Sequence, residues 1–316
     1  MITTGFAPAH IDIESKAMET LASHGKTFYW ASFFLSVKQA RAAAKLYACC
    51  RALDDIADST THSNATKHQS LQDLKLKLEN HDLPCDHALA QALRSLTTEH
   101  QLPKAAIISL IEGLIADTER VAIDNKRALD RYCYRVAGTV GLMMCGILGV
   151  TDRHALPFAI DLGIAMQLTN ISRDVLEDAE LGRRYIPLDV TPVEIRFASD
   201  PIRTRIQQTV ADQLLRAEAF YESGLRGLAY LPRSSRIAIF VAAHLYRAIG
   251  RKLQNNGCAW WEGRTVISPT EKLRLILGLI PKLIYVVLQP SPKKDWQHAS
   301  HLHASLEGLP YVDPPS

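Results

Sequence analysis

The sequence predicts an all-α fold built as a single domain. Hydrophobic residues make up 47% of the 316-residue chain and charged residues 22%, so there is enough apolar material for a sizeable core. Strand signals are scarce, because no segment alternates regularly between apolar and polar residues and no β-rich block stands out. Helical periodicity is frequent instead: Val37, Ala40, Ala44 and Tyr47, for example, fall on one stripe.

Prolines divide the chain into successive helices. Because proline rarely continues a helix, helices are expected over residues 12–24, 37–58, 67–80, 87–99, 103–122, 128–149, 155–179, 202–230, 234–254 and 269–288. The segment 180–200 is the longest irregular connection between them, and long loops in compact domains are often functional. No linker or internal repeat interrupts the series, so we predict one domain over residues 1–290.

Residues 291–316 are expected to form a loosely ordered tail, since they are rich in proline and poor in apolar residues. His298, His301 and His303 lie close together in this tail. We expect them to be solvated, because neither helical spacing nor an acidic partner favours the alternative, a metal site.

Charge, cysteines and the N-terminus narrow the class of protein. A net charge of +3 and a pI of about 8.5 predict no nucleic-acid partner but are compatible with acidic small molecules such as diphosphates. The six cysteines form no C-x-x-C pair, which favours reduced thiols in a cytoplasmic protein. The N-terminus does not have the pattern of a signal peptide, and no apolar run reaches the ~18–20 residues of a spanning helix.

The stretch CCRALDDIADST carries three acids, Asp54, Asp55 and Asp58, in an apolar, alanine-rich run. Asp54 and Asp58 are four residues apart and share one face of a helix. Arg51 and Tyr47 lie one and two turns earlier. Carboxylates at this spacing repel each other unless a cation lies between them, and Mg²⁺, which prefers oxygen ligands, meets that need. The alternative is a capped, solvated helix end.

A second acidic stretch, MQLTNISRDVLEDAELGRRYIP, follows an apolar run. Asn170, Asp174 and Asp178 recur every four residues as a straight stripe along the predicted helix, and Gln167 extends the stripe upstream. Carboxylates in such a setting are desolvated and need a counter-charge, which a divalent metal supplies. The alternative is a salt-bridge network with three arginines: Arg173, Arg183 and Arg184.

Two such clusters facing each other across a helical bundle would form a clamp for a diphosphate. Mg²⁺ ions would bridge carboxylates and phosphate oxygens and offset the charge that develops when an allylic C–O bond breaks. Nearby arginines would add contacts to phosphate, and aromatic faces would stabilise the carbocation that remains. The two clusters therefore predict a magnesium-dependent site, with Mn²⁺ as an alternative ion.

Both acidic stretches closely resemble the paired motifs of the squalene/phytoene synthase family. The segments LYACCRALDDIAD and QLTNISRDVLEDAELGRRYIP carry the resemblance, and RYCYRVAGTVGLMMCGILGV and YRAIGRKLQNNGCAWWEGRTVISPTEKL extend it over roughly residues 15–280. The resemblance implies the all-helical isoprenoid synthase fold with a central active-site cavity. It also implies a prenyltransferase, most similar to the bacterial phytoene-forming members.

The resemblance implies roles for individual positions. The implied metal ligands are Asp54, Asp55, Asp58, Asn170, Asp174 and Asp178. The implied catalytic residues are Asp54, Asp58, Asp174, Asp178, Tyr47 and Arg51. The implied substrate-binding residues are Thr27, Phe28, Gln167, Arg173, Arg183, Tyr185, Tyr246, Arg264, Gly138 and Gly141. For the two glycines, close packing of helices is a second explanation, and both can hold at once.

One position departs from the family pattern. The family usually reads Ser-Lys-Ser-Phe near the N-terminus, and this chain reads Gly25-Lys26-Thr27-Phe28. Thr27 keeps a hydroxyl, but Gly25 lacks one that can contact diphosphate. The departure puts the role of this loop in doubt and leaves the implied reaction class unchanged.

The implied reaction joins two geranylgeranyl diphosphates head to head. One molecule ionises, and its C1 cation attacks the double bond of the other to give prephytoene diphosphate; this ionises in turn, rearranges and loses a proton to give phytoene. Neither step needs NADPH, which squalene synthases use. Two alternatives stay open: a synthase that uses farnesyl diphosphate to make squalene or dehydrosqualene, and a non-catalytic assembly factor on the same fold. The second is disfavoured because both acidic clusters are retained.

Long apolar substrates and products suggest contact with a membrane. The segment 273–290, LRLILGLIPKLIYVVLQP, is the candidate for peripheral association, although charged residues and a proline make it a poor spanning helix. The alternative is a core helix that closes the bundle. Other enzymes of carotenoid synthesis are the implied protein partners.

Overall fold

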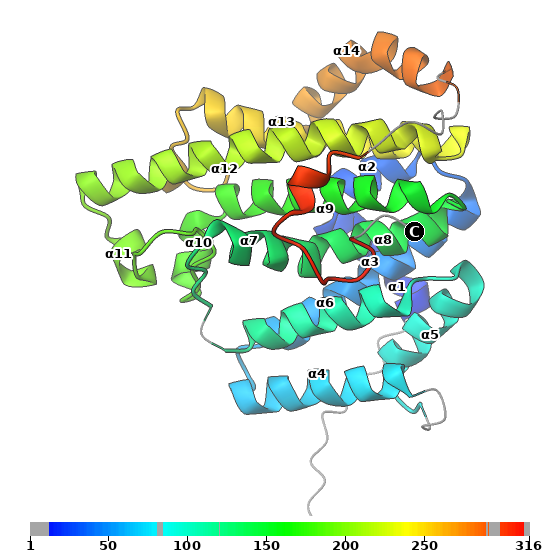
Figure 1. Cartoon of the computed structure of the whole chain (residues 1–316), viewed down its shortest axis with the longest axis horizontal. Helices are drawn as coiled ribbons and strands as arrows, with labels where there is room; N and C mark the ends of the chain where they lie inside the picture. Colours follow the sequence, from blue (N-terminus) through cyan, green and yellow to red (C-terminus); the bar gives the residue numbers. More distant parts are fainter. Residues whose placement is uncertain (1–12, 81–84, 120, 289, 291–297, 313–316) are drawn as a thin grey trace, which may run out of the picture.

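The computed structural model describes residues 13–80, 85–119, 121–288, 290 and 298–312, and within these ranges the chain is helical (Figure 1). The described residues contain no named strand; one isolated bridge pairs Ala122 with Arg184. The longer helices are α1 (Ile13–His24), α3 (Val37–Asp58), α4 (Asn64–Glu79), α5 (Ala88–His100), α6 (Lys104–Asp117), α8 (Thr139–Leu148), α9 (Leu156–Arg173), α12 (Asp200–Arg226), α13 (Arg233–Asn255) and α14 (Pro269–Leu288). The shorter ones are α2 (Lys26–Ser32), α7 (Lys126–Cys133), α10 (Val175–Glu180) and α11 (Pro192–Arg196).

Each predicted helix has a counterpart in this series, but four features differ from prediction. A short helix, α11, lies in the segment 180–200, which was predicted to be irregular. A short additional helix, α2, follows α1. The predicted helix 128–149 contains a π-helical turn, η1 (Tyr134–Gly138), between α7 and α8. The predicted helix 155–179 is divided at Asp174, whose φ of −103° and ψ of 16° are not helical. A change of dihedrals at one residue does not alter the spacing of apolar residues, so the sequence pattern could not predict this break.

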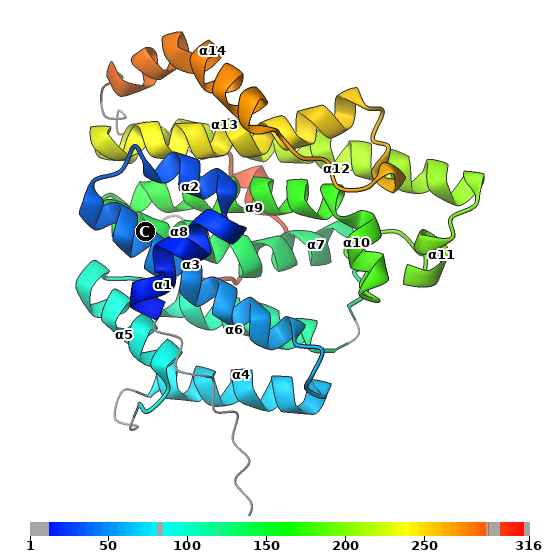
Figure 2. The same cartoon turned by 180° about the vertical axis from the view of Figure 1, so that it is seen from behind.

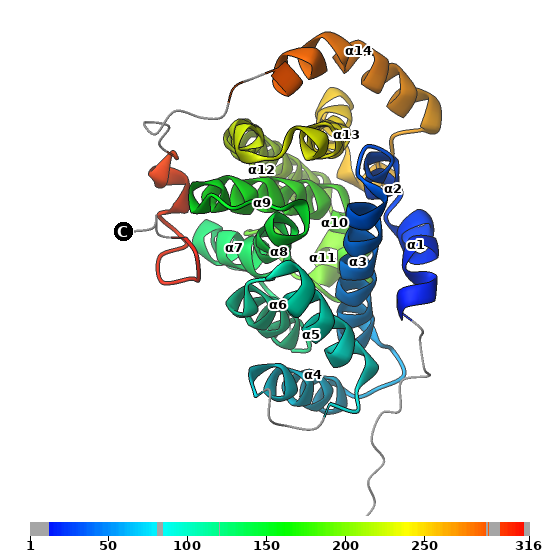
Figure 3. The same ribbon diagram turned by 90° about the vertical axis from the view of Figure 1, so that its right-hand side faces the viewer.

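Helix α9 occupies the middle of the bundle, with α12 and α13 on one side and α7 and α8 on the other (Figure 3). Its side chains Ile160, Ile164 and Leu168 are fully buried. Close approach to α8 depends on Gly141, where a Cβ atom would lie 2.3 Å from the carbonyl oxygen of Ala159. The packing explanation therefore holds for Gly141, and its contact with substrate stays a prediction.

Helix α14 lies on the outside of the bundle, against α13 (Figure 2). It carries Pro281 in its interior and buries few side chains, among them Leu279. Leu275, Leu279 and Leu283 pack on a small core cluster shared with α13, so one face of α14 closes the bundle as the alternative expected, while its other face is exposed. No helix in the described ranges is both long and apolar enough to cross a membrane.

The C-terminal segment 298–312 is packed onto the bundle, which differs from the loose tail that the composition predicts. Leu306, Leu309 and Val312 join the main core cluster. Tyr134 donates a hydrogen bond to the carbonyl oxygen of Pro310 at 2.5 Å. The expectation of solvated histidines is wrong for two of the three, since His303 is buried and His298 is mostly so. Residues 291–297 and 313–316 of the predicted tail lie outside the described residues.

Candidate functional site

The first acidic cluster lies on the last two turns of α3. Asp54 is partly buried, whereas the side chains of Asp55 and Asp58 are 56% and 43% exposed. Arg51 pairs with Asp55 at 2.7 Å, one turn along the helix. Asp54 is thus the member of this cluster that the fold removes most from water, as expected for an acid facing a site.

The second cluster spans the break between α9 and α10. Asn170 lies on α9, Asp178 on α10, and Asp174 at the break itself, so the predicted straight stripe on one helix is wrong. Two arginines contact Asp174: the Nε of Arg173 donates to it at 2.7 Å, and the Nε of Arg264 lies 3.3 Å away. Backbone hydrogen bonds of helical spacing continue across the break, from the Asp174 N–H to the carbonyl oxygen of Asn170 at 2.9 Å and from the Asp178 N–H to that of Asp174 at 2.8 Å.

Arg183 connects the two clusters. Its Nη1 lies 2.7 Å from Asp58 on α3, and its positive charge opposes the rise in the pKa of Asp178 on α10. The neighbouring Arg184 stabilises loop structure instead, because its Nη1 donates to the carbonyl oxygens of Ile123 and Leu188, each at 2.6 Å. A salt-bridge network of all three arginines is therefore not formed: Arg184 shapes the loop, and Arg173 and Arg183 serve the two clusters.

The electrostatics of the clusters call for a cation. Burial, with repulsion from Asp58, raises the pKa of Asp54 to about 7. Burial, with repulsion from Asp174, raises the pKa of Asp178 to about 8. Among the described residues neither carboxylate has a lysine or arginine within ion-pair distance. Both acids are therefore costly to ionise unless positive charge is added.

The same residues fit an oxygen-preferring metal ion. The Oδ1 atom of Asn170 is buried and has no hydrogen-bond partner in the described part of the chain, while its Nδ2 donates to Gln167 at 3.3 Å. An orphaned amide oxygen beside partly buried carboxylates is the donor set that Mg²⁺ takes. The predicted ligands Asp54, Asn170 and Asp178 carry this fit, and Asp55, paired with Arg51 at the surface, contributes least to it.

Aromatic side chains from three helices meet close to the first cluster. The ring of Phe28 lies 6.2 Å from that of Tyr47 and 5.1 Å from that of Tyr246. Burial raises the pKa of Tyr47 to about 12, so this phenol stays neutral. The departure at Gly25 has a steric reason here, because a Cβ atom would lie 2.9 Å from both the Leu21 side chain and the Tyr47 ring.

Sequence reasoning missed two residues, Asp117 on α6 and Tyr132 on α7. The hydroxyls of Tyr132 and Tyr185 donate to Asp117 at 2.9 and 3.4 Å, and the two rings stack at 4.8 Å. Burial raises the pKa of Asp117 to about 6. Asp117 and Tyr132 also line a cavity of 350 Å³ between α6 and α7. The one signal in the sequence was an acid at the end of the apolar run LIEGLIAD.

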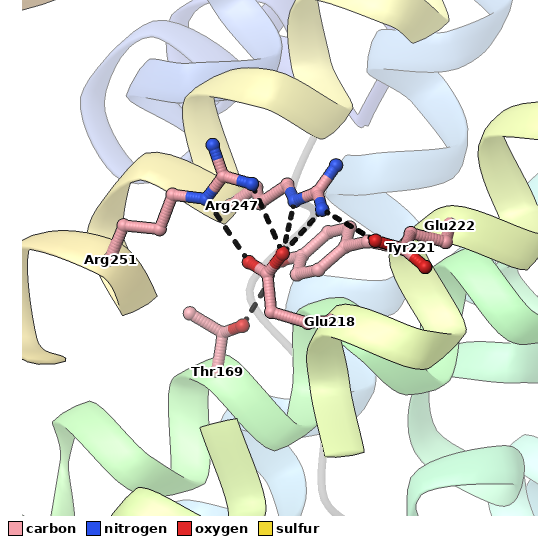
Figure 4. A network of polar contacts seen from close by, with 6 residues as sticks. All are labelled: Thr169, Glu218, Tyr221, Glu222, Arg247 and Arg251. Carbon is pink, nitrogen blue, oxygen red and sulfur yellow. Dashed lines mark hydrogen bonds and ion pairs between the residues drawn. The ribbon is translucent and has the colours of Figure 1, made fainter. Parts of the chain in front are cut away.

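A polar network joins α9, α12 and α13 next to this site (Figure 4). Glu218 on α12 accepts from Arg247 at 2.7 Å and from Arg251 at 3.1 Å. The hydroxyl of Tyr221 lies 3.1 Å from that of Thr169. Arg247 follows Tyr246 in the chain and Thr169 precedes Asn170, so the network holds in register the helices that present site residues.

Comparisons with known proteins agree with this arrangement. The profile of the squalene/phytoene synthase family matches residues 21–271, a range that includes both acidic clusters. A 15-cis-phytoene synthase of Pantoea ananas is 33% identical over 297 residues, which cover 89% of this chain and 96% of that protein. Another, from Enterobacter agglomerans, is 35% identical over 265 residues and covers 80% and 90% of the two chains.

Solved structures share the fold. A dehydrosqualene synthase aligns with a TM-score of 0.74 at 23% identity, over 86% of this chain and 97% of that chain. A squalene synthase from Alicyclobacillus acidocaldarius aligns with a TM-score of 0.66 at 22% identity, over 78% and 94%. These alignments confirm the predicted all-α fold.

Proposed function

Because the chain belongs to the squalene/phytoene synthase family, we propose that it is a phytoene synthase that joins two geranylgeranyl diphosphates head to head. The observation that supports this most directly is the pair of acidic clusters on α3 and on α9–α10, connected through Arg183. The two phytoene synthases that match over most of their length support a C40 product rather than a C30 product.

The residues of the site divide the work between charge and shape. Asp54, Asp58, Asn170, Asp174 and Asp178 would hold Mg²⁺, which when bound supplies positive charge against a leaving diphosphate. Arg183 and Arg264 lie at the clusters and are placed to bind phosphate oxygens. In this proposal the oxygen ligands set where the diphosphate lies, and the arginines set its orientation.

The aromatic residues would serve the hydrocarbon half of the substrate. Phe28, Tyr47 and Tyr246 form a group of rings beside the first cluster, and ring faces stabilise a nearby carbocation through their quadrupole. The high pKa of Tyr47 keeps its phenol neutral, so no phenolate, which is the stronger nucleophile, lies beside that cation. Asp117, with its pKa near 6 and two tyrosine hydroxyls, is a group that could take up a proton.

A product assay tests the proposal. Purified chain is incubated with Mg²⁺ and either geranylgeranyl or farnesyl diphosphate, with and without NADPH, and the hydrocarbon is identified by mass. We expect a C40 hydrocarbon from geranylgeranyl diphosphate without NADPH. A C30 product from farnesyl diphosphate, with none from geranylgeranyl diphosphate, would overturn the proposed substrate but not the proposed reaction class. No product from either substrate would overturn the proposal that the chain is catalytic.

We propose further that α14 docks on an anionic membrane surface. Leu273, Leu277, Ile280, Ile284 and Leu288 follow a spacing of three to four residues along one face, and all five are at least 43% exposed. Exposed Arg274 and Lys282 add positive charge close to this face. Such an arrangement is typical of helices that lie in the plane of the interface and would receive an apolar product.

Co-sedimentation with anionic vesicles at low salt tests this docking. The paired change Leu277→Glu with Ile284→Glu should abolish binding, because it places charge on the apolar face. The matched control, Leu76→Glu, alters an exposed leucine on α4 and should bind like the unchanged chain. Equal binding of all three proteins, or none by the unchanged chain, would contradict the proposal.

A further inference from the structure

Asp161, His298 and His303 form a second cluster of metal-binding side chains, separate from the acidic clusters. We propose that they bind a divalent transition metal of the Zn²⁺ class, which fastens the C-terminal segment to α9. The ligand atoms of the three residues all lie within 4.8 Å of one another. The Nε2 of His298 lies 2.6 Å from one carboxylate oxygen of Asp161, and the Nε2 of His303 lies 2.8 Å from the other.

The donor set suits this class of metal. Two imidazole nitrogens and one carboxylate oxygen are typical Zn²⁺ ligands, whereas Mg²⁺ prefers oxygen alone. Bonds of about 2.0–2.1 Å in a tetrahedron place ligand atoms about 3.3 Å apart. The two short contacts, 2.6 and 2.8 Å, would therefore lengthen by about half an ångström. Ligand atoms that lie as far as 4.8 Å apart would approach one another to the same spacing, with water as the fourth ligand.

Charge gives an independent argument. Asp130 and Asp161 are the two carboxylates that are buried among the described residues, at 7% and 0% exposure. Asp130 has an arginine partner, Arg216, whereas within the described part of the chain the polar contacts of Asp161 are those with the two imidazoles. A buried carboxylate held by two imidazoles, which are charged only when protonated, lacks a permanent counter-charge. A divalent cation supplies that charge.

The surroundings point to a structural site of moderate affinity. Asp161 belongs to α9, while both histidines belong to the segment 298–312, so a shared metal ties the segment to the centre of the bundle. The rings of Phe158 and His298 pack edge to face, with their centroids 5.3 Å apart. The Nδ1 of His303 is buried without a hydrogen-bond partner in the described ranges, so this ligand lacks outer support. We therefore expect a Zn²⁺ affinity about 10–100-fold weaker than that of a site whose histidines are all supported.

The segment has other contacts that hold it when no metal is bound. Arg131 donates to the carbonyl oxygen of Glu307 at 2.9 Å, and Ser305 donates to Asp130 at the same distance. Replacing one histidine should therefore remove the metal site and leave the protein folded. This makes single histidine variants usable in a binding test.

Cobalt spectroscopy on the full chain, free of any affinity tag and first treated with a chelator, is the experiment. Tetrahedral Co²⁺ with nitrogen ligands absorbs strongly in the visible range, and octahedral Co²⁺ held by oxygens alone absorbs weakly. We expect one equivalent of Co²⁺ to give the strong bands, Zn²⁺ to displace it, and thermal unfolding to shift upward with Zn²⁺. His298→Ala and His303→Ala should lose the bands, while the control His301→Ala, an exposed histidine of the same segment, should keep them.

Two results would overturn the proposal. Strong bands that persist in both His298→Ala and His303→Ala would place the metal elsewhere. Absence of strong bands in the unchanged chain, with equal melting in chelator and in Zn²⁺, would mean that the cluster is only a hydrogen-bonded contact between the segment and Asp161. If one histidine variant does not fold, the other still shows whether the bands depend on this cluster, and the titration of the unchanged chain tests binding itself.

Discussion

Replacing Asp178 by asparagine should stabilise the metal-free protein and abolish turnover. Burial, with repulsion from Asp174, raises the pKa of Asp178 from 3.8 to about 8. Because this pKa is higher in the folded state than in the unfolded one, the folded state binds the proton more tightly. The free energy of unfolding therefore falls as pH rises from about 4 to about 8. Asparagine has nearly the same shape and carries no charge, so the variant does not lose stability through ionisation of a buried carboxyl.

The size of the effect follows from the same values. Each pKa unit corresponds to about 1.4 kcal/mol, so a rise from 3.8 to about 8 corresponds to about 6 kcal/mol as an upper bound. Asp178 is only partly buried by its accessible surface, and solvent screens part of the repulsion. We therefore expect Asp178→Asn to raise the free energy of unfolding by about 2 kcal/mol near pH 9 in chelator, and by much less near pH 5.

Urea unfolding in chelator at both pH values, repeated with Mg²⁺, measures these differences. Mg²⁺ should stabilise the unchanged chain more than the variant, because the variant lacks one carboxylate ligand. The control Asp55→Asn alters an exposed acid with a surface ion pair and should change unfolding by less than about 1 kcal/mol. A variant that is less stable than the unchanged chain near pH 9 in chelator would refute the reasoning.

Three further changes test other parts of the site. Gly25→Ser should lower the free energy of unfolding by about 1–3 kcal/mol, since its Cβ would lie 2.9 Å from two side chains; unchanged thermal unfolding would contradict this. Glu218→Gln should cost about 1–3 kcal/mol at pH 7 in urea unfolding. Because contacts such as that with Arg247 outweigh burial and lower the Glu218 pKa, this difference should shrink below about pH 4.5 and would be refuted by a constant one. Tyr132→Phe removes a donor that lowers the pKa of Asp117, so any activity limb governed by Asp117 should move upward from about pH 6, and an unmoved pH–rate profile would exclude that role.

Local spacing in the sequence determined the all-α class and the acidic pair on α3. Asp54 and Asp58 share a face because a helix repeats every 3.6 residues, and this needs no tertiary information. The same reasoning failed at Asp174, where the stripe is divided, because one residue with non-helical dihedrals leaves the surrounding residue pattern unchanged. Periodicity therefore did not predict that the stripe is divided between α9 and α10.

Only the tertiary structure decided the contacts between distant segments. Asp117 and Tyr132 meet because α6 packs against η1, the turn that follows α7, and nothing local to either residue indicates the other. The C-terminal segment is the clearest case: its composition predicts a solvated tail, yet His298 finds Asp161, 137 positions earlier in the chain. A polar side chain is buried when a distant partner satisfies it, and that partner is supplied by the packing of the whole bundle.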